Sequence, residues 1–312
     1  MKFTVVIPLY NKRNYIEKTI LSVLKQTFTD YEIIVVDDGS RDDSAEIVRA
    51  MKNEKVHLIS QKNQGVAVAR NTGIQNAKGT YISFLDADDA WNEDYLETID
   101  GLTNRYPQSD IYVTAYHVNF GNGKIKTSTQ LEPPEGCLES YWLTLEKGYD
   151  FVWTSVTTVR KDALLEAGCF KPGEMIGQDL DMWARVAKNN PAVAYSSKVC
   201  ACYNRSAEHN ARTRVKIASA EAFRQDLVEQ LENPERSASE KDAIQKKYDK
   251  KMTAYIFTCI LAGEKARAAE ELQNWKGRKG LRNGLLRSGL RVAKLMPTKL
   301  NHLIYRIRLK VF

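Results

Sequence analysis

The chain has 312 residues, of which 43% are hydrophobic and 27% charged, and its formal net charge is +7. This composition is typical of an ordinary globular protein and excludes a disordered or fibrous one. The longest nearly apolar stretch, residues 254–263, is about half as long as the roughly 20 residues of a membrane-spanning helix, so we expect no such helix. Residues 1–11 lack the apolar length of a signal peptide, and we therefore expect a cytoplasmic protein.

Short β-rich runs recur in the first 95 residues, at 3–7, 32–36, 56–60 and 80–85. Between the first two runs, Ile16, Ile20 and Leu24 fall on one helical face, and residues 42–52 carry a similar apolar pattern. This alternation predicts βαβ units and a parallel sheet covered by helices on both faces. Because ligands of such a sheet bind at the carboxyl ends of its strands, functional residues should follow the strands directly.

Two adjacent carboxylates, Asp37 and Asp38, follow the second predicted strand. One of them can accept a hydrogen bond from a nucleobase; alternatively, both serve a turn and a helix N-cap, where Asp is common. Residues 8–11, after the first strand, lack the glycines of a G-x-G-x-x-G turn, and the chain has no P-loop motif. The sequence therefore argues against a dinucleotide site and against a P-loop nucleotide hydrolase.

The fourth predicted strand leads directly into three carboxylates, those of Asp86, Asp88 and Asp89. Like charges this close resist joint ionisation unless a cation or a water-rich opening compensates. A divalent metal is the simplest compensation, and Mg²⁺ or Mn²⁺ would take a few carboxylates together with phosphate oxygens and water. The alternative is an acidic turn that caps a helix starting near Asn92, which suits Asp89 better than all three residues.

The elements predicted after residue 92 are a helix at 93–105, a strand at 111–118, a loop at 121–136, a strand at 151–159, and helices at 161–167 and 179–188. Helical periodicity dominates from about residue 216 and is interrupted at Asn233-Pro234 and at 236–239. We therefore predict one domain at 1–215 and a helical region at 216–312.

The five cysteines are few and odd in number, and only Cys200 and Cys202 form a close pair. This pair should lie on one face of a strand, and no second pair stands at zinc-site spacing. We expect reduced thiols that serve packing.

Four motifs of the first 95 residues, VVIPLYN, VVDDGS, QGVAVARNTG and FLDADD, occur in an order and spacing that resemble the inverting family 2 nucleotide-sugar glycosyltransferases. The resemblance resumes at Gly168-Cys169-Phe170 and at residues 177–183, where Gln178 replaces the usual Glu of an acceptor-side motif. It implies the α/β GT-A fold: a Rossmann-like, mostly parallel sheet flanked by helices, with a C-terminal helical extension. Residues 1–95 would be the nucleotide-binding half of the catalytic domain and residues 96–215 the acceptor half.

The resemblance also implies how the nucleotide would be held. Pro8 and Tyr10 would flank the nucleobase, with Tyr10 stacking on uracil if the donor is a UDP-sugar. Asp38 would accept a hydrogen bond from the base, and Arg70 would lie near the nucleotide pocket and orient its carboxylates.

Metal and diphosphate contacts follow from the same resemblance. Asp86 and Asp88 would form the D-x-D element, with Asp88 the more direct ligand of Mn²⁺ or Mg²⁺, which stabilises the leaving diphosphate as a Lewis acid. In the segment after the last core strand, His209 would complete the metal shell and Arg205 would contact the diphosphate. Alternatively, His209 is a solvated loop residue.

On the acceptor side, Asp179 is the candidate catalytic base that takes the proton of the attacking hydroxyl. The alternative role of Asp179 is a helix N-cap, and Asp181 is the second choice for the base. Trp153, Thr154 and Ser155 are candidates for the sugar or acceptor pocket, although Trp153 could also be part of the core.

The C-terminal tail, residues 276–312, holds eleven basic residues and no acidic one, which leaves a net charge of −4 on the rest of the chain. Leucines at spacings of three to five predict an amphipathic helix that lies on an anionic membrane surface. The alternatives are docking on the catalytic domain or on another subunit. Nucleic acid is disfavoured because neither stacking aromatics nor a recognised motif accompanies the charge.

Together these features predict a metal-dependent transferase that moves a sugar from a nucleotide sugar to a glycan or lipid-linked acceptor. We expect it at the inner face of the cell membrane, in surface polysaccharide or glycolipid synthesis. Two alternatives stay open: a noncatalytic carbohydrate-binding or anionic-surface-binding protein on a degenerate scaffold, and a nucleotidyltransferase.

Overall fold

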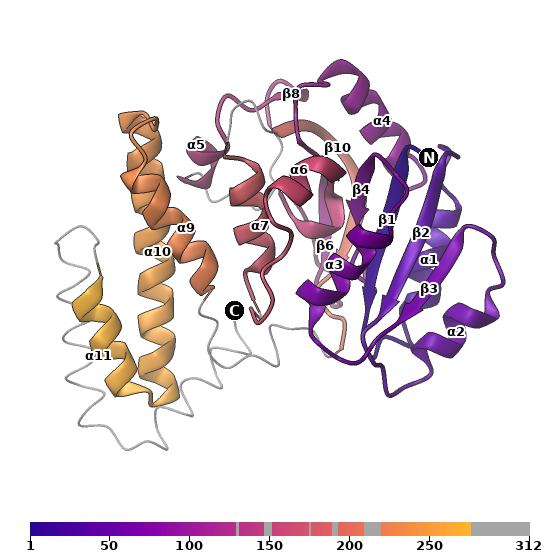
Figure 1. The fold of residues 1–312 in the computed structure, drawn as a ribbon, viewed down its shortest axis with the longest axis horizontal. Coiled ribbons are helices and arrows are strands. Elements are labelled where there is room, and N and C mark those ends of the chain that lie inside the picture. Colours follow the sequence, from indigo (N-terminus) through magenta and orange to yellow (C-terminus); the bar gives the residue numbers. More distant parts are fainter. Residues whose placement is uncertain (129–130, 147–151, 175, 189–192, 209–219, 276–312) are drawn as a thin grey trace. The chain divides into compact units, whose positions relative to one another are not determined.

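The computed structural model describes residues 1–128, 131–146, 152–174, 176–188, 193–208 and 220–275 (Figure 1). The chain divides into two compact units, one made of residues 1–174 and 178–208, the other of residues 175–177 and 209–312. Among the described helices, none combines the length and the apolar character needed to cross a membrane.

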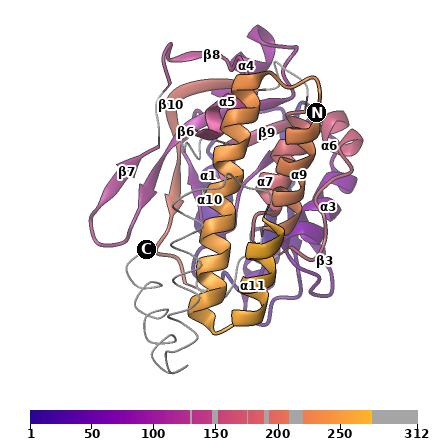
Figure 2. The ribbon, with the colours of Figure 1, turned by 90° about the vertical axis from the view of Figure 1, so that its left-hand side faces the viewer.

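The described part of the second unit contains three helices, α9 (Glu221–Glu232), α10 (Ala238–Ala262) and α11 (Lys265–Asn274), which lie side by side (Figure 2). A capping box between Ser237 and Glu240 begins α10. From α9, Arg224 donates to the Met252 sulfur at 2.9 Å and pairs with Glu271 of α11 at 3.2 Å. The predicted helical region is confirmed up to residue 275, and the basic tail lies outside the described residues.

A ten-stranded mixed sheet forms the centre of the first unit, with the main order β3-β2-β1-β4-β9-β6-β10-β5. Its main strands are β1 (Phe3–Leu9), β2 (Tyr31–Asp37), β3 (Val56–Ser60), β4 (Tyr81–Phe84), β6 (Ile111–Asn119), β9 (Thr157–Arg160) and β10 (Val193–Asn204). The first four are mutually parallel, β9 runs antiparallel between β4 and β6, and β6 is parallel to β10. Six of these seven strands therefore point the same way, which confirms the expected mostly parallel sheet.

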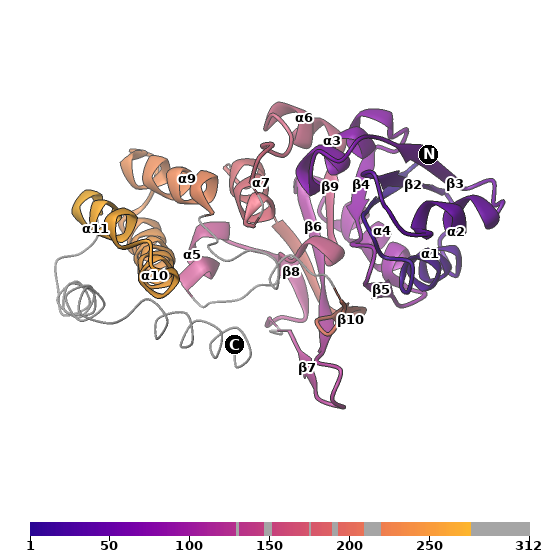
Figure 3. The ribbon, with the colours of Figure 1, turned by 90° about the horizontal axis from the view of Figure 1, so that it is seen from below.

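Helices cover the sheet on both faces, as the apolar strands require (Figure 3). One face carries α1 (Ile16–Leu24) and α4 (Tyr95–Arg105), and the other carries α3 (Val66–Asn76), α6 (Lys161–Glu166) and α7 (Gln178–Val186). The remaining short helices are α2 (Ser44–Ala50), α5 (Tyr141–Glu146) and the 3₁₀ turn η1 (Thr154–Val156). On the α3 face, a Cβ at Gly73 would overlap the Val6 side chain, so the helix can lie this close to β1 only with glycine there.

Two predicted elements of the second half are wrong. The strand predicted at 151–159 is shortened to β9 because η1 precedes it: the Val156 N–H and the Thr157 hydroxyl both bond the Trp153 carbonyl, at 3.0 and 2.8 Å. The predicted loop at 121–136 contains two short strands, β7 (Ile125–Thr127) and β8 (Glu135–Cys137), which pair antiparallel with β6 and β10. Strand β5 (Ala90–Trp91) pairs with β10 at the far edge.

The five cysteines have free thiols, of which Cys200 and Cys259 are buried. Burial raises the pKa of the Cys200 thiol to about 11, which keeps it protonated near neutral pH. This agrees with the expected packing role.

Candidate active site

The segments after β1, β2 and β4 meet at the edge of the sheet where parallel strands end, and η1 and α7 lie beside them. The register fixes this arrangement: Leu9 pairs with Asp37 at the end of β1 and β2, and Val6 pairs with Phe84 of β4. The segments that follow these strands carry Tyr10, Asp38, Asp86 and Asp88, so the topology gathers these four predicted site residues at one place.

Each of the three carboxylates after β4 has a different partner. Asp86 accepts from the Arg70 guanidinium at 2.7 Å, and Asp88 accepts from the Lys12 ammonium at 2.6 Å. Asp89 is buried and accepts from the Ser155 hydroxyl at 2.6 Å and from the Asn204 N–H at 2.9 Å. The cluster therefore contains two carboxylates paired with cations and one bound only to neutral donors.

Burial is the largest influence on the pKa values of Asp88 and Asp89. It raises the pKa of Asp88, with the Lys12 ammonium opposing the shift. It raises the pKa of Asp89 well above the usual range, and the neighbouring charges of Asp88 and Asp86 add to the effect. The alternative role of Asp89 as a helix cap is not what the structure shows, because α4 begins only at Tyr95 and the Asp89 side chain bonds η1 and the end of β10.

Arg70 is buried on α3, and its guanidinium lies 5.3 Å from the centre of the Phe170 ring. Its Nη2 donates to Asp86, but its Nε and Nη1 have no hydrogen-bond partner within the described part of the chain. Buried donors are rarely left unsatisfied, so these two nitrogens point to a ligand with acceptor oxygens. An anionic ligand at this edge fits them.

Asp38 organises the loop that leads into α3. Its Oδ1 accepts from the Gln61 side chain at 2.8 Å and from the Gln64 N–H at 2.9 Å, and its Oδ2 accepts from the Gly65 N–H at 2.8 Å. A carboxylate offers about four acceptor positions, which leaves room for one further donor such as a base N–H. The preceding residue, Asp37, accepts from the Ser40 N–H at 3.0 Å, so the turn role considered for this pair applies to Asp37.

Pro8 and Tyr10 lie at the end of β1, both half-buried. Pro8 is opposite Val36 in the parallel pairing with β2, and Tyr10 follows the strand directly. Their predicted contacts with a nucleobase stay predictions.

Lys12 was missed by the sequence reasoning. It is 8% exposed, and its ammonium donates to Asp88 and to the Glu208 carbonyl, the latter at 2.8 Å. The sequence feature that could have indicated a functional role is its position directly after the VVIPLYN motif, in the loop that follows the first strand. What the sequence could not give is the pairing with a carboxylate 76 residues away.

The acceptor-side carboxylates also differ from one another. Asp179 is half-buried in the first turn of α7, where it accepts from the Thr154 hydroxyl at 3.2 Å and from the Leu180 N–H at 2.9 Å. Because α7 begins at Gln178, Asp179 lies inside the helix and is not its N-cap. Asp181 is fully buried and pairs with Lys171 at 2.8 Å and with Arg185 at 2.6 Å, which commits it to the scaffold and removes it as second choice for the base.

Adjacent residues of η1 connect the two groups of carboxylates. Ser155 donates to Asp89 and accepts from the Asp86 N–H at 3.1 Å, while Thr154 donates to Asp179. Trp153, just before η1, stacks at a tilt between two tyrosines, with ring centres 4.6 Å from Tyr116 and 4.7 Å from Tyr203. The predicted segment 153–155 is thus a bridge between the acidic cluster and the candidate base.

Arg205 lies beyond the end of β10, where its N–H bonds the Asn119 carbonyl at 3.0 Å and its guanidinium lies 5.1 Å from the centre of the Phe120 ring. Its predicted diphosphate contact stays a prediction. His209 lies outside the described residues.

Asp86 and Asp88 offer the hard oxygen ligands that Mn²⁺ and Mg²⁺ prefer. Within the described ranges, however, no group of three or more His, Cys, Asp or Glu residues is placed to hold a metal ion. A cation at these two carboxylates would therefore have to take its other ligands from phosphate oxygens and water.

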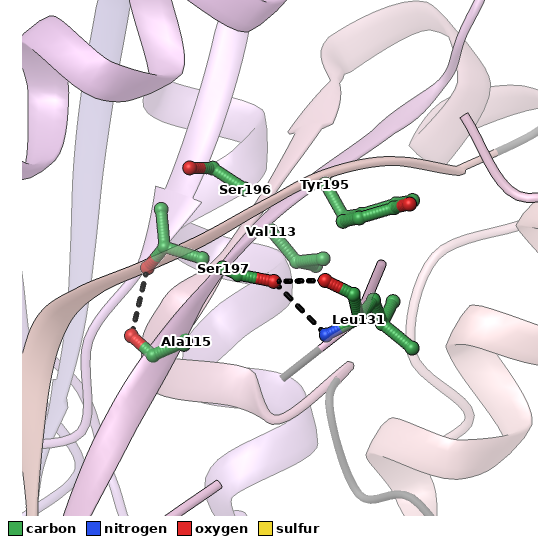
Figure 4. Close-up of a pocket in the computed structure, with 7 residues that line it drawn as sticks. Val113, Ala115, Leu131, Tyr195, Ser196 and Ser197 are labelled. Carbon is green, nitrogen blue, oxygen red and sulfur yellow. Dashed lines mark hydrogen bonds between the residues drawn. The ribbon is translucent and has the colours of Figure 1, made fainter. Parts of the chain in front are cut away.

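A small pocket with room for about one water molecule lies elsewhere, between the first half of β6 and the bulge of β10 (Figure 4). Its lining includes Val113, Thr114 and Tyr195, and the Ser197 hydroxyl on its wall bonds the backbone of Leu131. It contains none of the candidate site residues.

Many curated relatives match parts of the chain, among them the following three. GlyA of Streptococcus pneumoniae serotype 4 is 42% identical over 118 residues, which are 37% of this chain and 17% of that protein. The uncharacterized glycosyltransferase alr2836 of Nostoc is 35% identical over 171 residues, which are 53% of this chain and 52% of that protein. TuaG of Bacillus subtilis, a glycosyltransferase named for teichuronic acid biosynthesis, is 43% identical over 97 residues, or 30% and 38%. The chain thus matches between about a sixth and a half of the length of these relatives.

Solved structures resemble the whole chain. Residues 1–349 of TarS from S. aureus, in complex with UDP-GlcNAc, share 18% identity at a TM-score of 0.68, covering 98% of this chain and 92% of that one. The mannosyltransferase PcManGT from Pyrobaculum calidifontis, in complex with GDP-Man and Mn²⁺, shares 17% identity at a TM-score of 0.60, covering 99% and 86%. These similarities establish the GT-A fold.

Residues 4–167, just over half of the chain, match the family described as Glycosyl transferase family 2. The chain therefore belongs to glycosyl transferase family 2.

Proposed function

We propose that this protein is an inverting, metal-dependent glycosyltransferase that moves a sugar from a UDP-sugar to a glycan or lipid-linked acceptor. The observation that carries the proposal is the bridge at η1, where Ser155 binds Asp89 and the Asp86 backbone while its neighbour Thr154 binds Asp179. A donor held at the acidic cluster would lie beside a half-buried carboxylate on the acceptor side. That pairing of groups suits a single displacement at a sugar carbon.

Donor binding would use the segments after the first, second and fourth strands. Pro8 and Tyr10 would hold the base, with the remaining acceptor position of Asp38 taking its N–H. The two unpartnered nitrogens of Arg70 would donate to donor oxygens. Asp88 and Asp86, with His209, would hold Mn²⁺ or Mg²⁺, which supplies Lewis-acid stabilisation of the charge on the departing diphosphate. Arg205 would add a second cationic contact with the diphosphate.

Proton transfer would rest on Asp179. As the acceptor hydroxyl oxygen attacks the anomeric carbon, Asp179 takes the hydroxyl proton, and the bond between that carbon and the diphosphate oxygen breaks with its electron pair on the diphosphate. Attack opposite the leaving group inverts the configuration. Thr154 holds one oxygen of Asp179 in place and so orients the other.

The acceptor would bind near Trp153, which stacks with Tyr116 in β6 and with Tyr203 near the end of β10. Aromatic faces suit the apolar C–H surfaces of sugars. TuaG is named for teichuronic acid biosynthesis, and this similarity supports a surface glycan or glycolipid as the acceptor.

We also propose that the protein binds the inner face of the cell membrane through its basic tail. The eleven basic residues of 276–312, interspersed with leucines, support binding to anionic lipid at the inner face of the cell membrane. Removing residues 276–312 should release the protein from vesicles of phosphatidylglycerol and leave UDP-sugar hydrolysis intact. Retained binding by the shortened chain would contradict this role.

The test of the function is release of UDP from a panel of UDP-sugars, with and without Mn²⁺. We expect slow, Mn²⁺-stimulated release, abolished by Asp88→Ala and retained by the control Asp162→Ala. Asp162 is an exposed carboxylate that pairs with Arg160. Arg160 lies opposite Tyr81, the first residue of β4, whereas the acidic cluster follows the last residue of that strand. Release of pyrophosphate from a nucleoside triphosphate would instead indicate a nucleotidyltransferase, and inactivity toward every nucleotide sugar would favour a noncatalytic protein.

A further inference from the structure

Lys12 has a buried ammonium group that none of the roles above uses. Its Nζ lies 2.6 Å from Asp88 Oδ2, and the two side chains are only 10% and 14% exposed. The second acceptor of the ammonium is the Glu208 carbonyl at 2.8 Å. The carboxylate proposed as the main metal ligand is thus already paired with a cation of this chain.

The backbone of Lys12 is fixed. Its N–H donates to the Ser44 hydroxyl at 2.9 Å, and its carbonyl accepts from the N–H groups of Tyr15 and Ile16 at 2.9 and 3.0 Å, at the start of α1. Any rearrangement at this position is therefore confined to the lysine side chain. A four-carbon stem with a compact charged end can move between nearby acceptors without moving the chain.

The second cation of the cluster differs in this respect. Arg70 is 3% exposed, donates to Asp86, and lies against the Phe170 ring, so its planar guanidinium is held by packing as well as by charge. The Lys12 ammonium also lies over a ring, 5.8 Å from the centre of Tyr15, but it ends a flexible four-carbon stem and is held by two hydrogen bonds. A compact ammonium on such a stem exchanges partners more readily than a planar guanidinium packed on its ring.

We propose that the Lys12 ammonium takes the place of the divalent cation at Asp88 in the free enzyme, and that it transfers to the donor diphosphate when donor and metal bind together. The inference rests on the proposed function, because it assumes a metal at Asp88. Ammonium and metal compete for one carboxylate, and their mutual repulsion is strong in a site this buried. Metal without nucleotide must displace Lys12 and leave the ammonium without a carboxylate partner, whereas the diphosphate supplies a new one. Lys12 thus makes metal binding depend on the donor.

The test measures Mn²⁺ binding by electron paramagnetic resonance of the free ion, with full-length protein and with or without UDP. Without UDP, Lys12→Met should bind Mn²⁺ on the order of tenfold more tightly than the unaltered protein, and its affinity for UDP in the presence of Mn²⁺ should fall by a similar factor. Lys12→Arg keeps the charge and should keep Mn²⁺ binding weak. The control is Arg13→Met, which removes a neighbouring cation that pairs with Asp43 on the surface.

Equal Mn²⁺ affinity of Lys12→Met and the unaltered protein without UDP would overturn the proposal, as would an equal gain in Arg13→Met. If Mn²⁺ binds in no variant even with UDP, the metal site itself is refuted and the Lys12 role with it. Mn²⁺ binding that needs UDP in every variant alike refutes only the role of Lys12.

A second measurement uses only the unaltered protein, so its result does not depend on whether a variant folds. Reductive methylation of the unaltered protein, read at Lys12 by mass spectrometry, should be slow in the free enzyme, faster with saturating Mn²⁺ alone, and slow again with Mn²⁺ and UDP. Identical labelling in all three states would contradict the exchange of partners.

Discussion

Two short acidic segments in different parts of the first unit, 86–89 and 179–181, each combine a buried carboxylate with a less buried one. Each contains one buried carboxylate that serves the scaffold: Asp89 binds Ser155 and Asn204, and Asp181 binds Lys171 and Arg185. Each also contains a less buried carboxylate, Asp88 or Asp179, that remains a candidate for chemistry. Burial separates the two kinds, because each kind includes one carboxylate paired with a cation and one bound to neutral donors.

The largest effect on transfer with donor binding left intact is expected for Asp179→Asn. An amide of the same shape cannot accept the acceptor proton, so transfer should slow by about 10³-fold while UDP affinity stays unchanged. Transfer can be followed by UDP release in the presence of acceptor, and UDP binding by calorimetry. Transfer within about threefold of the unaltered protein would remove Asp179 from its role.

The largest effect on stability is expected for Asp181→Ala. This change removes the buried carboxylate that pairs with Arg185. The Arg185 guanidinium would keep its hydrogen bond to the Cys169 carbonyl at 2.7 Å but would lose its counter-charge. The free energy of unfolding should fall by about 3 kcal/mol, below the full value for a completely buried pair because Lys171 is 43% exposed. Urea denaturation measures it, and a loss below about 1 kcal/mol would show that the pair contributes little.

A smaller loss of stability is expected for Asp89→Ala. The Ser155 hydroxyl and the Asn204 N–H would lose their acceptor, which should cost about 2 kcal/mol. Asp89→Asn should cost less, because burial raises the pKa of Asp89 and an amide resembles the uncharged acid. The same urea titration compares the two variants; an equal or larger loss in Asp89→Asn would mean that the charged form matters here.

The smallest effect is expected for Thr154→Val, which removes the hydroxyl that holds Asp179 but keeps the side-chain shape. Losing one hydrogen bond of about 1 kcal/mol should slow transfer roughly fivefold and leave UDP binding unchanged. Kinetics with saturating donor measure this change. An unaltered rate would mean that Asp179 is oriented without Thr154.

The first half of the fold could be predicted from the sequence because its strands are largely apolar and the helices at α1 and α2 carry clear apolar stripes. The same holds for the gathering of Asp38, Asp86 and Asp88, since parallel strands bring their carboxyl ends together. The second half was harder: β-branched residues around Val156 suggested a longer strand, whereas a local turn at Trp153 stops it. The partners of Lys12 and Arg70 depend on contacts between distant segments, which periodicity and motifs do not specify.

The central claim is that the acidic cluster after β4 and Asp179 act on the same bound donor. A crystal grown with UDP and Mn²⁺, with the metal located by its anomalous scattering, tests it most directly. We predict Mn²⁺ between Asp88 and the diphosphate, with the Asp179 carboxylate facing the space left for the sugar. Diphosphate bound away from residues 86–88, or Asp179 turned into the packed interior, would contradict the account.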